Sequence, residues 1–148
     1  MARRQIPNAL RREVIERAAG RCEYCLIHEN DAPESHQLDH LIALKHGGKT
    51  VSENLALACI ACNSYKGSDV ASIDPVHQMI VPLYNPRVQK WEDHFQVVGA
   101  AIIGLSPIGR ATIGLLRLNE DDRLATRRAL VASGHYPPSE DSNAEGTR

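Results

Sequence analysis

Four cysteines are arranged as two C-x2-C pairs, and they are the clearest metal-binding pattern in the chain. The pairs are Cys22/Cys25 and Cys59/Cys62, with 33 residues between them and no cysteine elsewhere. Thiolates two residues apart can bind one Zn²⁺ from a tight turn, and two such turns complete a closed tetrahedral site without an open position for water. We therefore predict one structural zinc ion, with unrelated buried cysteines or a redox pair as the alternatives. The separation exceeds the roughly 15–20 residues of a simple zinc ribbon, which predicts a folded insert between the pairs.

The predicted insert carries side chains suited to metal-assisted hydrolysis. Asp39 and His40 are adjacent, Asn54 follows His40 by fourteen residues, and Asn63 follows nine residues later. Histidine can take a proton near neutral pH, and a carboxylate with an amide oxygen suits a hard cation such as Mg²⁺ or Mn²⁺. A base beside such a cation is suited to hydrolysing a phosphodiester. Because adjacent strand residues point to opposite faces, a site shared by Asp39 and His40 requires a local twist of the backbone.

Three further polar residues lie close to this group in the sequence. His36 precedes His40 by four residues, so it either reaches the substrate or lies at a solvated strand end. Lys66 is either a phosphate contact or an ordinary surface lysine that follows the second cysteine pair. His46 belongs to a turn with two glycines, where a positional role is favoured over a catalytic one.

The elements that would position these residues follow from apolar spacing and turn formers. Leu10, Val14, Ile15 and Ala18 recur at helical spacing after a capping Asn8. Partial alternation over 36–44 predicts a strand, and the glycines that follow permit a reversal. The predicted order is a helix over 8–19, a strand over 36–44, a short return over 49–52, and a knuckle at Cys59 that continues into a helix to about residue 68.

The remainder of the chain predicts an extension built on this core. Prolines within 69–90 argue against long regular elements there, which favours an extended wrap across the surface. Aromatic residues over 91–95 are interpreted as packing residues, and 96–105 is typical of a strand or hairpin. Ser106 and Pro107 form a helix start, and a second helix is predicted from Asn119 to about Ser133. The polar tail over 137–148 is predicted to be disordered.

Length and composition limit the classes of protein that fit. A chain of 148 residues with 43% apolar residues fits one domain, and its aromatic content of only 4% makes a structural metal useful. The net charge of −1 gives no global argument for a nucleic-acid partner, although arginines concentrate near the N-terminus. We see neither an apolar run of membrane-spanning length nor a secretory signal, so we expect a cytoplasmic protein with reduced thiols.

Taken together, these motifs resemble the HNH (ββα-metal) endonuclease superfamily, in particular small bacterial HNH proteins with a four-cysteine zinc site. The resemblance covers residues 20–68 and extends less specifically to the segment that begins with "PLYNPRVQKWEDHF". The matching motifs are Cys22-x2-Cys25, Asp39-His40, His46-Gly-Gly, Glu53-Asn54-Leu55, Cys59-x2-Cys62 and Asn63-x2-Lys66-Gly67.

The resemblance implies a role for each site residue. His40 matches the general base, Asp39 the first metal ligand and Asn54 the central asparagine that braces the loop. Asn63 stands where many members have histidine, so this would be an HNN variant that prefers catalytic Mg²⁺ or Mn²⁺. The expected activity is hydrolysis of DNA, with a homodimer or a targeting partner as further expectations. The alternative is a catalytically inactive, zinc-stabilised nucleic-acid-binding module.

The resemblance also implies an α+β fold with the ββα-metal core at its centre. We predict an N-terminal basic helix over 1–20, the core with its zinc knuckles over 21–68, and a mixed extension over 69–136 that ends in helices. The predicted disordered tail over 137–148 completes the chain.

Overall fold

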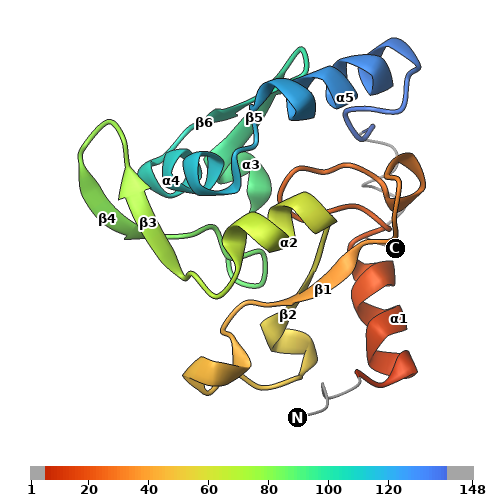
Figure 1. Ribbon diagram of the computed structural model, residues 1–148, viewed down its shortest axis with the longest axis vertical. Coiled ribbons are helices and arrows are strands. Elements are labelled where there is room, and N and C mark those ends of the chain that lie inside the picture. Colours follow the sequence, from red (N-terminus) through yellow and green to blue (C-terminus); the bar gives the residue numbers. More distant parts are fainter. Residues whose placement is uncertain (1–5, 140–148) are drawn as a thin grey trace.

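The structure is a computed structural model that describes residues 6–139, and it is a mixed α+β fold with small antiparallel sheets. Its helices lie around three two-stranded sheets (Figure 1). The helices are α1 (Asn8–Arg17), α2 (Ile60–Lys66), α3 (Trp91–His94), α4 (Pro107–Leu116) and α5 (Asp121–Ala132). The strands are β1 (Gln37–His40), β2 (Leu55–Ala58), β3 (Ala71–Asp74), β4 (Met79–Pro82), β5 (Phe95–Val98) and β6 (Ala101–Gly104).

The β1–β2 hairpin and helix α2 form the ββα core that the sequence predicts. The two strands are antiparallel, and Asp39 pairs with Ala56 while His40 pairs with Leu55. All residues of β2 are buried. In β1 only Asp39 is buried, and its side chain faces α2. Strand β1 is shorter than the predicted strand over 36–44, because the chain leaves the strand pairing after His40. The returning strand begins at Leu55, whereas the prediction placed it over 49–52.

Helix α1 covers the far side of the core hairpin. Its Val14 is fully buried and packs with Leu55 and Leu57 of β2 in a small apolar cluster. Arg17 donates to the carbonyl oxygen of Leu55 at 2.7 Å and to the hydroxyl of Ser52 at 2.8 Å. This arginine therefore fixes the helix to the hairpin, although its neighbours Arg11 and Arg12 stay exposed.

The larger apolar core joins the cysteine pairs to the C-terminal segments. Phe95, Ile102 and Leu116 are buried together with the four cysteines. Trp91, predicted as a packing residue, lies against this cluster with its ring centre 5.0 Å from that of Phe95. Residues far apart in sequence thus share one core around the cysteines.

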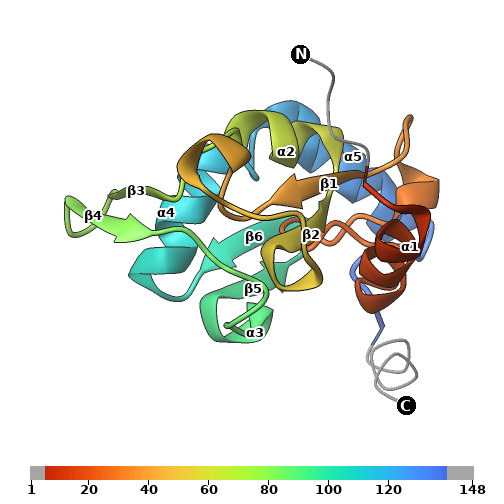
Figure 2. The ribbon, with the colours of Figure 1, turned by 90° about the horizontal axis from the view of Figure 1, so that it is seen from below.

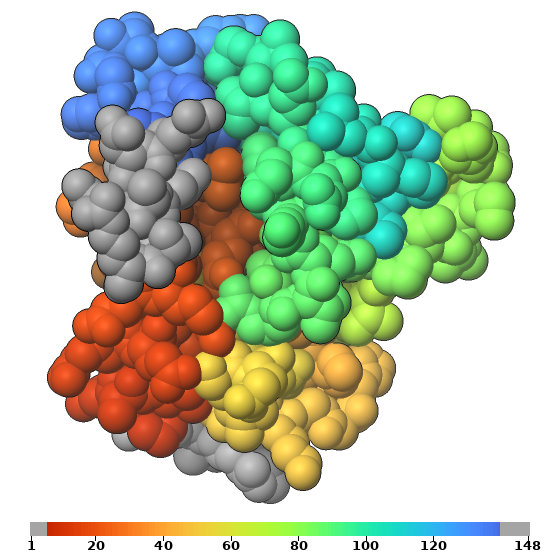
Figure 3. All heavy atoms as spheres, turned by 180° about the vertical axis from the view of Figure 1, so that it is seen from behind, coloured from red at the N-terminus to blue at the C-terminus, as the bar shows by residue number. Residues whose placement is uncertain are grey.

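Residues 69–90 differ from the predicted extended wrap. They form the β3–β4 hairpin, which projects from the body of the molecule (Figures 1 and 2) and is visible at one side in the space-filling view (Figure 3). Pro75 lies in its turn and Pro82 at the end of β4, where no ladder N–H is required. Asp74 attaches the hairpin to α4 through a paired contact with Arg110, at 2.8 Å and 3.0 Å. The outer face of the hairpin exposes Ile73 and Ile80.

The remaining elements follow the predicted pattern. β5 and β6 form a hairpin, and α4 begins as expected, with the Ser106 hydroxyl accepting from the N–H of Gly109 at 3.0 Å. Helix α5 ends near the predicted residue. Within residues 6–139, no helix combines the length and apolar character needed to cross a bilayer. Of the predicted disordered tail over 137–148, residues 140–148 lie outside the described residues, as do residues 1–5 of the predicted basic helix.

Candidate active site and zinc centre

The four cysteines converge as the sequence predicts. Their sulfur atoms all lie within 4.8 Å of one another, with Cys25 and Cys59 at 3.7 Å. Zinc–sulfur bonds of about 2.3 Å in a tetrahedron place sulfur atoms about 3.8 Å apart, so this spacing fits Zn²⁺. Three of the cysteines are fully buried, and Cys59 is 8% exposed. The cluster fits a closed structural zinc site.

Each cysteine pair forms a tight turn in which a backbone N–H faces the first sulfur. The N–H of Cys25 donates to the Cys22 sulfur at 3.5 Å, and that of Cys62 donates to the Cys59 sulfur at 3.4 Å. Hydrogen bonds from the other cysteines lower the pKa of Cys25, whereas burial raises the pKa of Cys22 and Cys62. The turns therefore orient the sulfur atoms, and a bound cation would favour their thiolate forms.

An arginine from α5 lies against the cysteine cluster. The guanidinium of Arg123 donates to the Cys62 sulfur at 2.9 Å and to the carbonyl of Leu116 at 2.8 Å. Its side chain is buried, so the positive charge offsets part of the negative charge that zinc-bound thiolates carry. This contact has no signal in the sequence, because its partners lie 61 positions apart along the chain.

The Asp39 carboxylate is buried beneath α2 and held by two side chains. The Tyr24 hydroxyl donates to one of its oxygens, Oδ2, at 2.8 Å. The Lys66 ammonium lies 3.3 Å from Oδ1 and 3.2 Å from Oδ2. Burial raises the pKa of Asp39, while the Lys66 charge and the Tyr24 hydrogen bond oppose that rise. The Lys66 ammonium therefore balances the charge of the buried carboxylate, and a metal ion at Asp39 would have to compete with it.

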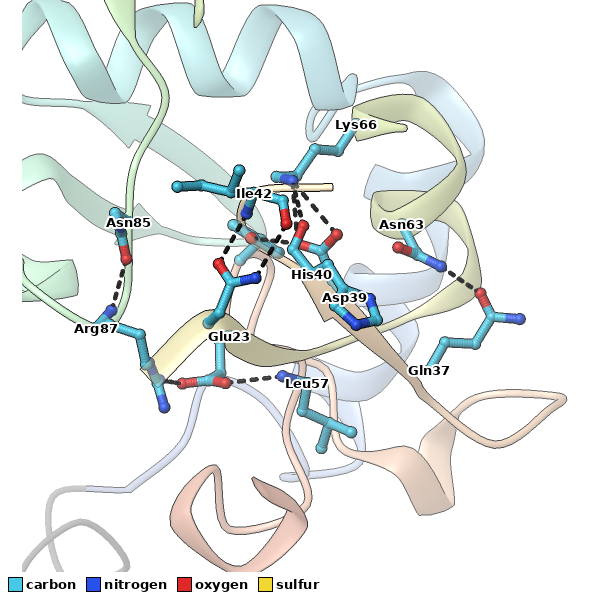
Figure 4. A network of polar contacts seen from close by, with 12 residues as sticks. Glu23, Gln37, Asp39, His40, Ile42, Leu57, Asn63, Lys66, Asn85 and Arg87 are labelled. Carbon is cyan, nitrogen blue, oxygen red and sulfur yellow. Dashed lines mark hydrogen bonds and ion pairs between the residues drawn. The ribbon is translucent and has the colours of Figure 1, made fainter. Parts of the chain in front are cut away.

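His40 and Asn63 lie on either side of this carboxylate. The His40 ring reaches Thr50, with Nε2 and the hydroxyl oxygen 2.9 Å apart. Asn63 projects from α2 one turn before Lys66, and its amide nitrogen donates to the Gln37 side chain at 2.6 Å. Figure 4 shows the Asn63 oxygen on the side that faces Asp39. Asp39 and His40 thus lie on β1, and Asn63 lies on the adjacent helix α2; a carboxylate and an amide oxygen are ligands that a hard divalent cation prefers.

Asn54 braces the loop that follows β1. Its side-chain oxygen accepts from the N–H of Ile42 at 2.9 Å, and its nitrogen donates to the carbonyls of Ile42 at 3.0 Å and Lys49 at 2.9 Å. Thr50, which contacts His40, lies in the same loop. These contacts tie the Asn54 side chain to Ile42 and Lys49 of the loop, and the role of Asn54 in catalysis stays a prediction.

Two residues lie elsewhere than their predicted substrate roles require. His36 is 5% exposed, and its Nε2 contacts the carbonyl of Ile27 at 2.8 Å, so it is neither a substrate contact nor a solvated strand end. Lys66 is 3% exposed because its ammonium turns inward to Asp39 and the His40 carbonyl. His46 lies exposed in the glycine turn, as expected.

Sequence reasoning missed two residues that hold the site. Tyr24 lies inside the first C-x2-C pair but contacts Asp39, and Thr50 contacts His40. The position of Tyr24 between two predicted metal ligands could have indicated a structural contact, because an aromatic residue there is held in place by the cysteines beside it. Thr50 carries no comparable pattern.

Comparison with known proteins agrees with this geometry. The family model of HNH endonucleases matches residues 22–69, which contain both cysteine pairs and the whole Asp39, His40, Asn54 and Asn63 set. This segment is an HNH endonuclease domain. Its ββα core and its cysteine cluster confirm the fold and the zinc-site geometry that the sequence predicts.

Similarity to a curated protein extends beyond the HNH domain. The Septu protein PtuB of Bacillus thuringiensis is 24% identical over 122 residues, which cover 81% of this chain and 45% of PtuB. The chain thus spans less than half the length of this relative. No solved structure matches the chain.

Proposed function

We propose that this protein is a divalent-metal-dependent HNH endonuclease that hydrolyses DNA phosphodiester bonds. The observation that carries the proposal is the match of residues 22–69 to the HNH endonuclease family, because this segment contains His40 and Asp39 on β1 and Asn63 on helix α2. The reduced cysteines that zinc requires are consistent with action in the cytoplasm.

In the proposed reaction, His40 activates the water that attacks phosphorus. With hydrogen on Nε2 donated to Thr50, the other ring nitrogen, Nδ1, carries the lone pair that takes a proton from water. The bracing of the loop by Asn54 keeps Thr50, and through it the imidazole, in one orientation. The products expected from the family resemblance have 5′-phosphate and 3′-hydroxyl ends.

Asp39 and Asn63 are the proposed ligands of Mg²⁺ or Mn²⁺. When bound, such an ion supplies neutralisation of the charge on the phosphorane and on the leaving oxygen. The Asn63 side-chain nitrogen donates a hydrogen bond to the Gln37 side-chain oxygen. The side-chain oxygen of Asn63 is therefore the atom proposed to bind the cation. The Lys66 ammonium balances the charge of Asp39 and lies against both carboxylate oxygens, so the ion would displace it or share the carboxylate with it.

The alternative is the inactive nucleic-acid-binding module. The Asp39–Lys66 ion pair favours it, because a buried lysine could replace the divalent ion permanently. The intact His40, held by Thr50, favours the enzyme, because a binding module has no need of an oriented imidazole.

Replacement of His40 separates these two functions. His40→Ala should reduce nicking of a supercoiled plasmid in Mn²⁺ by about a hundredfold or more, because a positioned base contributes roughly 10²–10⁴-fold. His46→Ala is the matched control, since this exposed histidine lies in the next turn and should retain activity. Equal nicking by His40→Ala and wild type would overturn the assignment of the base.

Cleavage of both strands needs more than one reaction. A single centre hydrolyses one strand at a time, so a double-strand break requires a second copy of the chain, a targeting partner or a second encounter. The predicted first product is therefore the open circle rather than the linear plasmid.

A further inference from the structure

Tyr24 joins the zinc knuckle directly to the proposed ion site. It lies between Cys22 and Cys25, and its side chain is fully buried. Its hydroxyl donates to Asp39 at 2.8 Å across a separation of 15 residues. One side chain therefore reaches from the cysteine cluster to the carboxylate proposed to hold the catalytic ion.

The position of Tyr24 is set by contacts that do not involve Asp39. The cysteines on both sides fix its backbone in the knuckle. Its carbonyl oxygen accepts from the indole N–H of Trp91 at 2.9 Å. Its ring packs edge-on against Tyr84, with ring centres 6.4 Å apart. The hydroxyl thus approaches Asp39 from a rigid frame.

The contact restrains the carboxylate because it joins one carboxylate oxygen to a donor whose ring and backbone are held by other contacts. A phenol O–H donates a single hydrogen bond, and Asp39 accepts it on Oδ2. The Lys66 ammonium lies 3.3 Å from Oδ1 and 3.2 Å from Oδ2, so a divalent ion would compete with it for the lone pairs that the Tyr24 hydrogen bond leaves.

We propose that Tyr24 is a positioning residue that orients Asp39 for the divalent ion and so couples the zinc knuckle to catalysis. The inference rests on the proposed function, because it concerns the same ion site. Groups that orient a metal ligand typically change metal affinity or activity 10–100-fold when they are removed.

Direct Mn²⁺ binding tests this role without relying on turnover. We expect Tyr24→Phe to weaken Mn²⁺ affinity about tenfold or more, measured from the EPR signal of free Mn²⁺. Zinc content and melting temperature should stay close to wild type, because Phe keeps the ring and its packing. At saturating Mn²⁺ the nicking rate should recover most of its wild-type value.

Tyr136→Phe is the matched control. Tyr136 is also buried and also donates a 2.8 Å hydrogen bond to the first cysteine pair, but its acceptor is the carbonyl of Cys25. We expect its Mn²⁺ affinity to equal that of wild type. Equal weakening in Tyr136→Phe and Tyr24→Phe would mean general loosening of the knuckle and would overturn the inference.

Asn63→Ala distinguishes failure of the inference from failure of the proposed ion site. If Asn63→Ala weakens Mn²⁺ binding while Tyr24→Phe does not, the ion site stands and the role of Tyr24 is overturned. If Asn63→Ala binds Mn²⁺ like wild type, the proposed ion site itself is wrong, and the inference falls with it. Weakening in both variants, but not in Tyr136→Phe, supports the coupling.

Discussion

At the Asp39 carboxylate, a divalent ion would have to share a buried site with the Lys66 ammonium. The two side chains are each 3% exposed and 3.2 Å apart. Breaking a buried ion pair by removing one partner typically costs about 3–5 kcal/mol, since the other charge is left unpaired. The lysine therefore stabilises the fold while it competes with the metal.

Lys66→Met tests this competition. We expect the zinc-loaded variant without added Mn²⁺ to lose about 3–5 kcal/mol of unfolding free energy, and to bind Mn²⁺ more tightly than wild type because the competing cation is gone. Urea unfolding and Mn²⁺ titration measure the two effects. Lys45→Met, at an exposed position, should change neither. Weaker Mn²⁺ binding by Lys66→Met would mean that the lysine assists the ion site instead.

Among the elements, α5 contributes to the zinc centre although it lies far from the cysteines in sequence. We expect Arg123→Met to accelerate zinc release to a chromophoric chelator about tenfold or more, because the buried guanidinium no longer balances the thiolate charge. Arg128→Met is the control, since Arg128 is exposed on the same helix. Unchanged zinc release from Arg123→Met would show that the contact does not stabilise the metal site.

The β3–β4 hairpin depends on an ion pair whose effect on stability varies with pH. Hydrogen bonding from Arg110 lowers the pKa of Asp74 below its usual range. In the unfolded chain that pKa returns to about 3.9. The pair therefore stabilises the fold above about pH 4, and this stabilisation is lost as the pH falls toward the folded-state pKa.

Asp74→Asn should remove that part of the acid sensitivity. Wild type should lose more unfolding free energy between pH 5 and about pH 2.5 than the variant does, as measured by urea unfolding at each pH. Asp69→Asn, at an exposed carboxylate just before the hairpin, should follow wild type. The same acid sensitivity in Asp74→Asn and wild type would contradict the assignment.

Across the whole molecule, the sequence predicted local features well and long-range ones poorly. Three predicted features rest on residues that are close together in the sequence, and the structure contains all three. They are the C-x2-C pairs of the cysteine cluster, the Ser106 cap of α4 and the apolar face of α1 around Val14. The sequence does not predict the β3–β4 hairpin, because prolines argue against long regular elements. Pro75 lies in the turn and Pro82 at the end of β4, which are positions that tolerate proline.

The burial of His36 and Lys66 was missed for a different reason. Both side chains are polar, and a single sequence does not show which buried groups will contact them. In the fold, Lys66 contacts the Asp39 carboxylate and His36 contacts the Ile27 carbonyl. Asn54 contacts the loop that follows β1, while its role in catalysis stays a prediction from the family resemblance. The residues that could not be predicted are those whose partners come from another element.

Nicking of supercoiled plasmid tests most directly whether the protein cuts DNA with His40 as the general base and with the help of a divalent ion. Zinc-loaded wild type should convert the plasmid to open circle in Mg²⁺ or Mn²⁺. EDTA in excess over the added ion should stop the reaction, and His40→Ala should lose it with zinc content and melting temperature unchanged. Folded, zinc-loaded wild type that binds DNA but leaves the plasmid intact with either ion would contradict the account and support the inactive binding module.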